Sequence, residues 1–230
     1  MPGERLERIL AGLAANDRWS SAHALCEVAT DILEVAGAGV MLMSGDVPRG
    51  SLCTTNAVSA LIEELQYTLG EGPCIDAYQQ DAVVIEPDLA DPRTPRWVAF
   101  TPRAVEAGAR AVFGFPLRAG AVRLGALNIY QDHPGPLSND QHADALVMAD
   151  VVAHWVLDVQ AEAPPGALAE ELEIGAEFYF IVHNAAGVVS VQLGVTVTEA
   201  MIALRAYAFA HDRPLRDVAQ DVVERRLRFG

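Results

Sequence analysis

The chain has 230 residues, enough for one or two domains, and 51% of them are hydrophobic. Thirty-eight residues are alanine, so fewer large side chains are available for a core than the hydrophobic fraction suggests. The formal net charge of -15 argues against a generally basic protein that coats nucleic acid. It leaves room for a small local binding surface.

The charge is unevenly distributed along the chain. Residues 1–177 contain 26 acidic and 10 basic residues, a balance of -16. Residues 178–230 contain 5 acidic and 6 basic residues, a balance of +1. A C-terminal segment with its own electrostatic character is one mark of a module that faces a polyanion.

The cysteines and the chain termini bear on the cellular compartment. Cys26, Cys53 and Cys74 are too few for a disulfide framework and lack the C-x-x-C spacing of metal sites. Residues 1–13 lack the apolar region of a signal peptide. Residues 178–198 carry no charge, but their polar side chains would be costly in lipid. We therefore expect a soluble, cytoplasmic protein.

The N-terminal region, residues 1–162, has the pattern of a mixed α and β domain. Helices are predicted over residues 4–15, 21–35, 57–68, 95–107 and 138–160. Strands are predicted over residues 38–44, 51–55, 82–85, 110–117 and 123–131. Residues 69–74 are predicted to form a loop, because of their glycine and proline content. This order fits an α+β fold, a central antiparallel sheet with helices on its faces.

The predicted helix 138–160 is apolar on nearly all sides. Asp150, His154 and Asp158 recur every fourth residue and form one narrow polar stripe. A helix that is apolar on two sides needs two surfaces to cover it. Its own sheet is one candidate and a second copy of the chain is the other, so we expect a homodimer through this helix.

The C-terminal region, residues 178–230, has the pattern of three short helices. Pro164 and Pro165 end the preceding helix, which makes residues 163–177 a linker and helical lead-in. Gly194 is placed to end the first helix, and Thr196 and Glu199 form a capping box for the second. Pro214 suits the first turn of the third. The predicted buried stripes are Phe178, Val182, Ala185, Val189 and Leu193, then Val197, Met201, Leu204 and Ala208, then Leu215, Val218, Ala219 and Val222. Short connections predict that the three helices pack as a bundle.

Short motifs in the N-terminal region resemble the GAF domain, a sensory α+β fold. They are Leu69-Gly70-Glu71-Gly72-Pro73-Cys74, Arg96-Trp97, Gly114-Phe115-Pro116-Leu117 and Leu124-Gly125-Ala126-Leu127. The resemblance implies a sensory pocket, for which Cys74 and Trp97 are the candidate residues. It leaves the ligand or cofactor unknown, because a heme, a cyclic nucleotide or no ligand would leave similar traces.

The C-terminal region resembles the ANTAR domain, an RNA-binding module of transcription antitermination regulators. The motifs are Ala185-Ala186-Gly187, Glu199-Ala200, Leu204-Arg205, Ala208, Leu215 and Val218-Ala219. The resemblance implies that the module binds hairpin loops in a nascent transcript and favours an antiterminator over a terminator. In this interpretation Arg205 lies between Ile202 and Phe209 as a platform for bases and phosphates. The other candidate RNA-binding residues are His183, Asn184, Arg213, Arg216, Arg225 and Arg226.

The match to this second family has one departure. The usual Gln-Ala-Lys-Gly is Asn184-Ala185-Ala186-Gly187 here, so the lysine is missing. If that lysine contacts phosphate in relatives, Ala186 removes one contact that contributes to salt-dependent affinity.

Two other functions remain open from the sequence. One is a GAF-fold enzyme that reduces free methionine sulfoxide, with Cys74 as nucleophile and Cys53 as the resolving cysteine. A small buried hydrophobe is the more usual role of a cysteine, and no partner acid or histidine is evident, so we expect no enzyme activity. The other is a GAF sensor whose C-terminal helices bind a protein. No cluster with metal-ligand spacing is present.

Overall fold

The computed structural model describes residues 2–15, 21–44, 47–91, 96–164, 169, 172 and 176–230. The chain divides into two compact units, residues 1–174 and residues 175–230.

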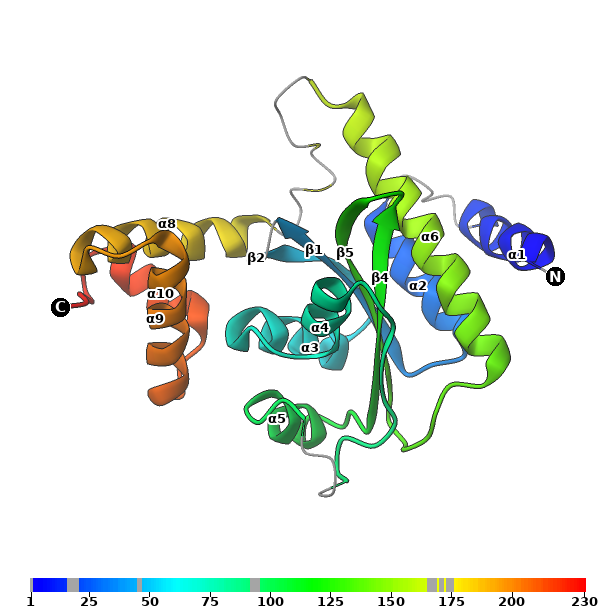
Figure 1. Cartoon of the computed structure of the whole chain (residues 1–230), viewed down its shortest axis with the longest axis horizontal. Helices are drawn as coiled ribbons and strands as arrows, with labels where there is room; N and C mark the ends of the chain where they lie inside the picture. The colour runs from blue at the N-terminus through cyan, green and yellow to red at the C-terminus, as the bar shows by residue number, and fades with distance from the viewer. Residues whose placement is uncertain are drawn as a thin grey trace. The chain divides into compact units, whose positions relative to one another are not determined.

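The first unit is built on a five-stranded sheet in which every pairing is antiparallel. The strand order is β2-β1-β5-β4-β3, so the two longest strands, β4 and β5, lie beside each other near the middle of the sheet (Figure 1). The strands are β1 Gly37–Ser44, β2 Val47–Thr54, β3 Val84–Glu86, β4 Ala111–Ala119 and β5 Val122–Gln131. The predicted antiparallel sheet is confirmed.

Helices α2 Ala22–Leu33 and α6 Asn139–Glu162 cover one face of the sheet, and α1 Pro2–Ala15 packs against both of them (Figure 1). The main apolar core of the unit lies between these helices and the sheet. The Ser21 side chain caps α2, and Ser138 forms a capping box with Gln141 at the start of α6. Local sequence therefore determines where both helices begin.

The opposite face carries α3 Ala57–Leu69, α4 Pro73–Gln80 and α5 Phe100–Glu106. Helix α4 corrects the prediction, because Pro73 and Cys74 belong to a helix and not to a loop. The proline occupies the first turn, where a missing N–H costs no helical hydrogen bond.

Other boundaries in the first unit also differ from the prediction. Strand β2 begins at Val47 and not at Ser51, because its first residues pair with the end of β1. Helix α5 begins at Phe100, since Trp97 just before it has a left-handed backbone with φ of 54°. Residue 95, where that helix was predicted to begin, lies outside the described residues.

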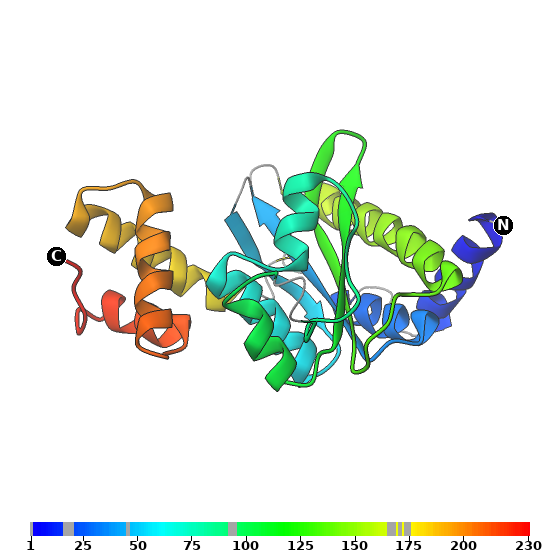
Figure 2. The same ribbon diagram turned by 60° about the horizontal axis from the view of Figure 1, so that its bottom comes forward.

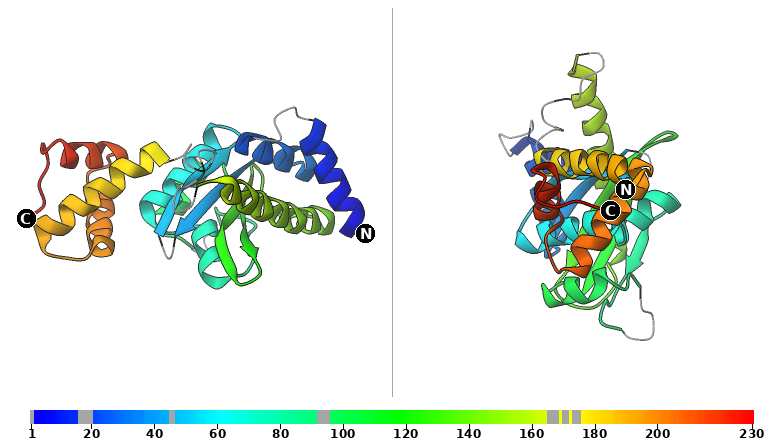
Figure 3. Two further views of the ribbon diagram at one scale, coloured as in Figure 1. Left: turned by 90° about the horizontal axis from the view of Figure 1, so that it is seen from above. Right: turned by 90° about the vertical axis from the view of Figure 1, so that its left-hand side faces the viewer.

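The second unit consists, in its described residues, of helices α8 Ala176–Leu193, α9 Val197–Ala210 and α10 Leu215–Val223. They pack against one another (Figures 2 and 3). The Thr196–Glu199 capping box and the left-handed Gly194, with φ of 69°, are as predicted. Leu193 and Val197 are exposed, contrary to prediction, because they flank the turn at Gly194. Pro214 precedes α10 as its N-cap and does not lie in the first turn.

Among the described residues, no single helix has the length and hydropathy of a membrane span. The segments Phe180–Leu193 and Val197–Ala210 pass such a test only when taken together, and they are bent by 104°.

Candidate functional site

Four side chains form a buried polar cluster between the sheet and the helices α3 and α4. Glu63 and Gln66 come from α3, Cys74 from the start of α4 and Asn128 from β5. Each is at most 3% exposed. Asn128 Nδ2 donates a hydrogen bond of 3.1 Å to Glu63 Oε1, and Cys74 Sγ lies 4.0 Å from the same oxygen.

Cross-strand register determines where this cluster lies. Asn128 is paired with Gly39 on β1 and with Gly114 on β4. A Cβ atom on Gly39 would lie 2.8 Å from Glu63 Oε1, and one on Gly114 would lie 2.4 Å from the Pro73 carbonyl oxygen. Glycine on both sides of Asn128 therefore lets the Glu63 side chain and the start of α4 approach the sheet.

The segment Leu69-Gly70-Glu71-Gly72-Pro73-Cys74 joins the two helices of the cluster. Gly70 ends α3 with a left-handed backbone at φ of 69°. Gly72 has φ of 135°, and a Cβ there would lie 2.5 Å from Gln66 Cγ. The backbone N–H of Cys74 donates to Gln66 Oε1 at 2.6 Å. The glycines thus bring the start of α4 onto the Gln66 side chain.

The electrostatics of the cluster follow from burial. Burial raises the pKa of Glu63 to about 8, and the hydrogen bond from Asn128 opposes this shift. Burial, followed by the charge of Glu63, raises the pKa of the Cys74 thiol well above its ordinary value. At neutral pH the predominant form of Glu63 is therefore a protonated acid, and Cys74 is a thiol.

Three buried atoms of the cluster have no hydrogen-bond partner among the described residues: Glu63 Oε2, Gln66 Nε2 and Asn128 Oδ1. With Glu63 protonated, they offer two donors and one acceptor. This arrangement is suited to hydrogen bonding with a small polar group and not to pairing with an ion. Within the described residues, no group of three or more His, Cys, Asp or Glu side chains is placed to hold a metal ion.

Trp97, the second predicted sensory residue, precedes α5 and contacts a different residue of α4. Its Nε1 donates to Asp76 Oδ2 at 3.1 Å, and Arg96 donates to the same oxygen at 3.1 Å. The Arg96 guanidinium lies over the Trp97 ring, 4.7 Å from its centroid. Helix α4 therefore connects the two predicted residues, with Cys74 toward Glu63 and Asp76 toward Trp97.

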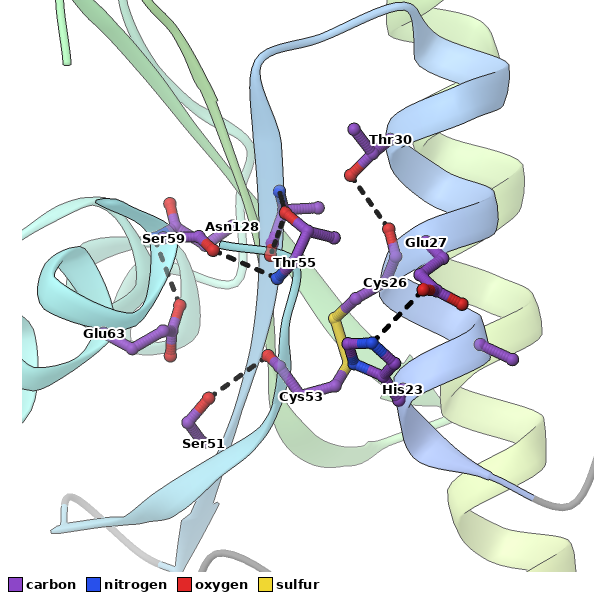
Figure 4. Close-up of a disulfide and its surroundings, with 12 residues drawn as sticks. His23, Cys26, Glu27, Thr30, Ser51, Cys53, Thr55, Ser59, Glu63 and Asn128 are labelled. Atoms are coloured by element: carbon purple, nitrogen blue, oxygen red, sulfur yellow. Dashed lines mark hydrogen bonds and ion pairs between the residues drawn. A yellow bond between two sulfur atoms is a disulfide. The ribbon is translucent and has the colours of Figure 1, made fainter. Parts of the chain in front are cut away.

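A disulfide joins Cys26 on α2 to Cys53 on β2, with a Cα–Cα distance of 6.1 Å (Figure 4). Figure 4 shows it on the opposite side of the strands from Glu63. The sequence analysis excluded a disulfide framework and did not predict this single bond. Because Cys53 is bonded to Cys26, it is not placed as the resolving cysteine for Cys74 that the enzyme alternative requires.

These observations describe a sheet with a helical core on one face and a buried polar cluster on the other. The sequence profile of the GAF domain matches residues 21–152, which is more than half of the chain. The chain belongs to the GAF domain family. Residues 1–174 are called the GAF unit from here on, and residues 175–230 the helical unit.

Solved structures agree with this fold. The GAF domain of a phosphoenolpyruvate-protein phosphotransferase from Coxiella burnetii is 14% identical, with a TM-score of 0.54, over 70% of this chain and 95% of that chain. The corresponding domain from Acinetobacter is also 14% identical, with a TM-score of 0.51, over 70% and 96%. A type II free methionine-R-sulfoxide reductase from Thermoplasma acidophilum is 19% identical, with a TM-score of 0.45, over 59% and 89%. At 14% identity the likeness to the two phosphotransferase domains shows the fold alone. No curated protein matches the chain.

The GAF unit also has a groove of about 570 Å³ beside α6, on the side of the sheet away from the polar cluster. Leucines of α1 and α2 line it, and so does the predicted polar stripe of Asp150, His154 and Asp158. At the other end of α6, the buried Asp144 accepts hydrogen bonds from Arg5 at 2.7 Å and Arg8 at 2.5 Å. These bonds hold α1 against α6.

In the helical unit, α9 carries the central predicted RNA-binding residues. Ile202 is 60% exposed and Phe209 is 49% exposed, whereas Arg205 is half-buried. His183 and Asn184 are exposed on α8. The apolar and polar residues predicted on both helices therefore lie at the surface, whereas Nε and Nη2 of Arg205 are buried.

The predicted arginines near the C-terminus fall into two groups. Asp221 binds Arg213 at 2.6 Å and Arg226 at 2.7 Å, and these hydrogen bonds lower its pKa. Arg216 and Arg225 are exposed and have no ion-pair partner within the described part of the chain. Asp221 therefore brings two of the predicted residues together and offsets their charge.

Ala186, where the second family has lysine, is fully buried. Its position lies inside the packed helices, so the residue presents no side chain at the surface.

Sequence reasoning missed Glu63, Gln66 and Asn128. A partial signal was present, because Glu63 and Gln66 are three residues apart in a helix and interrupt the apolar positions Ile62 and Leu65. Nothing local marks Asn128 as their neighbour, since the strand register alone brings it to Glu63.

Proposed function

We propose that the chain is a cytoplasmic RNA-binding transcription antitermination regulator. The GAF unit senses a signal, and helices α8, α9 and α10 bind hairpin loops in nascent RNA to prevent termination. The observation that carries the proposal is the exposure of Ile202 and Phe209 on α9, with Arg205 between them along the helix. Apolar side chains and arginine are suited to unpaired bases and phosphates of an RNA loop.

The signal is a small polar molecule held near the buried polar cluster. The support for this assignment comes from the buried atoms without a partner on Glu63, Gln66 and Asn128. Buried polar atoms normally form hydrogen bonds, and a small polar molecule would supply the missing partners. The GAF unit acts as a sensor and not as an enzyme. A buried thiol with a raised pKa makes Cys74 a poor nucleophile, because the thiolate is the reactive form. Unchanged sulfoxide turnover in Cys74→Ala would remove the enzyme alternative.

The regulator is a homodimer through α6. Leu146 and Leu157 of this helix are exposed, and Leu6 and Leu10 of α1 are exposed beside the groove. Burying large apolar side chains is the main source of stability in such interfaces. Light scattering measures the molar mass of the wild type and of the double variant Leu146→Glu, Leu157→Glu. Conversion to a monomer is expected, and an unchanged mass would remove the dimer from the proposal.

Fluorescence anisotropy of a labelled tandem-hairpin RNA, at two salt concentrations, tests RNA binding. A single hairpin and Arg205→Ala are the controls. Tight binding that requires both hairpins, weakens with salt and falls in the variant is expected, since phosphate contacts release counterions and two sites add avidity. Binding no stronger than that to an unrelated RNA would overturn the proposal.

A second candidate function is a GAF sensor whose helical unit binds a protein. The observation in its favour is apolar exposure, with Val191 84% exposed and Phe180 68% exposed on α8. Asp221 also offsets the charges of Arg213 and Arg226, which leaves less positive charge for RNA phosphates and so favours a protein partner. Failure of RNA binding together with saturable capture of one purified partner would establish this alternative.

A further inference from the structure

Three aromatic rings from two parts of the helical unit form a second surface, away from Ile202. Tyr207 lies on α9 and His211 follows one turn later as its C-cap, and their rings stack with centroids 3.9 Å apart and planes at 17°. Phe229, near the C-terminus, approaches the Tyr207 ring with centroids 5.3 Å apart. Tyr207, His211 and Phe229 are called the aromatic platform.

Hydrogen bonds from separate helices hold the platform in place. His211 Nδ1 lies 2.8 Å from the Tyr207 carbonyl oxygen at the end of α9. The backbone N–H of Phe229 donates to Gln192 Oε1 of α8 at 2.9 Å. The chain after α10 turns at Arg225, which has a left-handed φ of 62°. The tail is therefore fixed to α8 and α9 in the folded unit.

The platform remains accessible and has positive charge beside it. His211 is exposed, and Tyr207 and Phe229 are half-buried. Arg225 and Arg228, on the same short tail as Phe229, are exposed, and their guanidinium groups have no ion-pair or hydrogen-bond partner among the residues that the structure describes. This distinguishes them from Arg226, which binds Asp221. Two uncompensated guanidinium groups therefore lie on the same segment as the Phe229 ring.

We propose that the aromatic platform stacks an unpaired base of the RNA loop, while Arg225 and Arg228 contact the flanking phosphates. The inference rests on the proposed function and adds a contact surface to it. Aromatic side chains bind bases of any sequence by stacking, and arginine supplies the charge-assisted contacts to phosphate. The contacts of the tail with α8 and α9 hold the rings in place before RNA binds. Because the rings are already ordered, stacking a base on them costs less conformational entropy.

The test uses the full chain and the tandem-hairpin RNA with 2-aminopurine at one loop position at a time. Tyr207→Leu and Phe229→Leu remove rings, whereas Tyr207→Phe keeps the ring and removes only the hydroxyl. Val191→Ala, on the exposed side of α8, is the matched surface control. Circular dichroism melting checks that each variant is folded.

The wild type is expected to quench 2-aminopurine at one loop position. The two leucine variants are expected to bind about tenfold more weakly and to lose that quenching, while Tyr207→Phe and Val191→Ala retain both. RNA binding that is equal in wild type and leucine variants would overturn the platform and leave the proposed function intact. No RNA binding by the wild type would overturn both.

Discussion

The two units of this chain place their polar chemistry in opposite positions. The GAF unit buries Glu63, Gln66 and Asn128 inside its fold, next to the Cys74 thiol. In the helical unit, every fully buried residue that the structure describes is apolar, and the exposed residues include His211, Arg216, Arg225 and Arg228. A polar interior is suited to recognition of a small molecule, and a polar and aromatic exterior to recognition of a macromolecule. The difference therefore matches the division of roles that we propose.

The difference also predicts where each unit is vulnerable. A buried acid makes stability depend on pH, because the folded and unfolded states hold its proton with different affinity. An apolar interior depends on packing, and truncation of a core side chain affects it at any pH. Four sets of variants test this contrast.

Glu63→Gln is expected to remove a pH dependence from the GAF unit. The folded pKa of Glu63 is about 8, above the ordinary value of 4.5, so the unfolded chain loses this proton first as pH rises. The free energy of unfolding of the wild type should therefore fall between about pH 4.5 and 8, by about 1.4 kcal/mol per pH unit from this group. The glutamine variant should lack this fall, since its amide stays neutral.

Urea unfolding at pH 5, 6.5 and 8, followed by tryptophan fluorescence, measures the effect. Glu106→Gln, an exposed glutamate on α5, is the control. Parallel pH profiles for wild type and Glu63→Gln would show that Glu63 ionises equally in both states.

Loss of the Cys26–Cys53 disulfide is expected to destabilise the GAF unit by about 3.5 kcal/mol. The bond spans a sequence separation of 27, and an unfolded chain without it gains the entropy of that loop. The double variant Cys26→Ala, Cys53→Ala and the dithiol-reduced wild type should unfold at similar urea concentrations. If the dithiol destabilised the double variant as much as it destabilises the wild type, the stability loss could not be assigned to the Cys26–Cys53 bond.

Leu204→Ala is expected to destabilise the helical unit by about 3 kcal/mol, because Leu204 is fully buried on α9. All three tryptophans precede residue 175, so fluorescence reports on the GAF unit and helical circular dichroism on both. The fluorescence transition should stay in place. Ile202→Ala, an exposed apolar truncation on the same helix, should change stability by less than about 0.5 kcal/mol. Equal effects of the two variants would contradict the buried stripe.

Thr196→Ala is expected to cost about 1 kcal/mol in the helical unit. Thr196 Oγ1 accepts from the backbone N–H of Glu199 at 3.2 Å, and Glu199 Oε2 accepts from the Thr196 N–H at 2.8 Å. Thr198→Ala, an exposed neighbour inside the helix, is the control. Thermal melting that shifts equally in both variants would show that the cap contributes nothing specific.

Helix ends were the features that sequence predicted best. Ser21, Thr196 and Gly194 act through neighbours within five residues, so their chemistry is visible in the chain itself. Buried faces were predicted well in helix interiors, as at Val218 and Val222, and less well at helix ends, as at Leu193 and Val197. At an end the chain turns away, and side chains there lose the neighbours that helical spacing implies.

The start of α4 shows a limit of local reading. Glycine and proline before Cys74 indicated a loop, but Pro73 begins a helix that packs on Gly114 of β4. Tertiary contact decides between the two outcomes, because proline in a first turn is compatible with both.

The sequence alone was enough to predict the antiparallel α+β fold, the capped helices and the charge contrast between the two regions, since these depend on hydrophobic period, capping residues and composition. Four features became visible only in the folded chain: the Cys26–Cys53 pair, the contact of Glu63 with Asn128, the pairing of Asp221 with Arg213 and Arg226, and the ring contact of Phe229 with Tyr207. The reason is range. Most of these contacts join residues that are 22 or more positions apart in the sequence. The two Asp221 ion pairs are shorter in range, but they connect α10 to the turn before it and to the tail after it. Strand register and helix packing create them, and no local pattern records either.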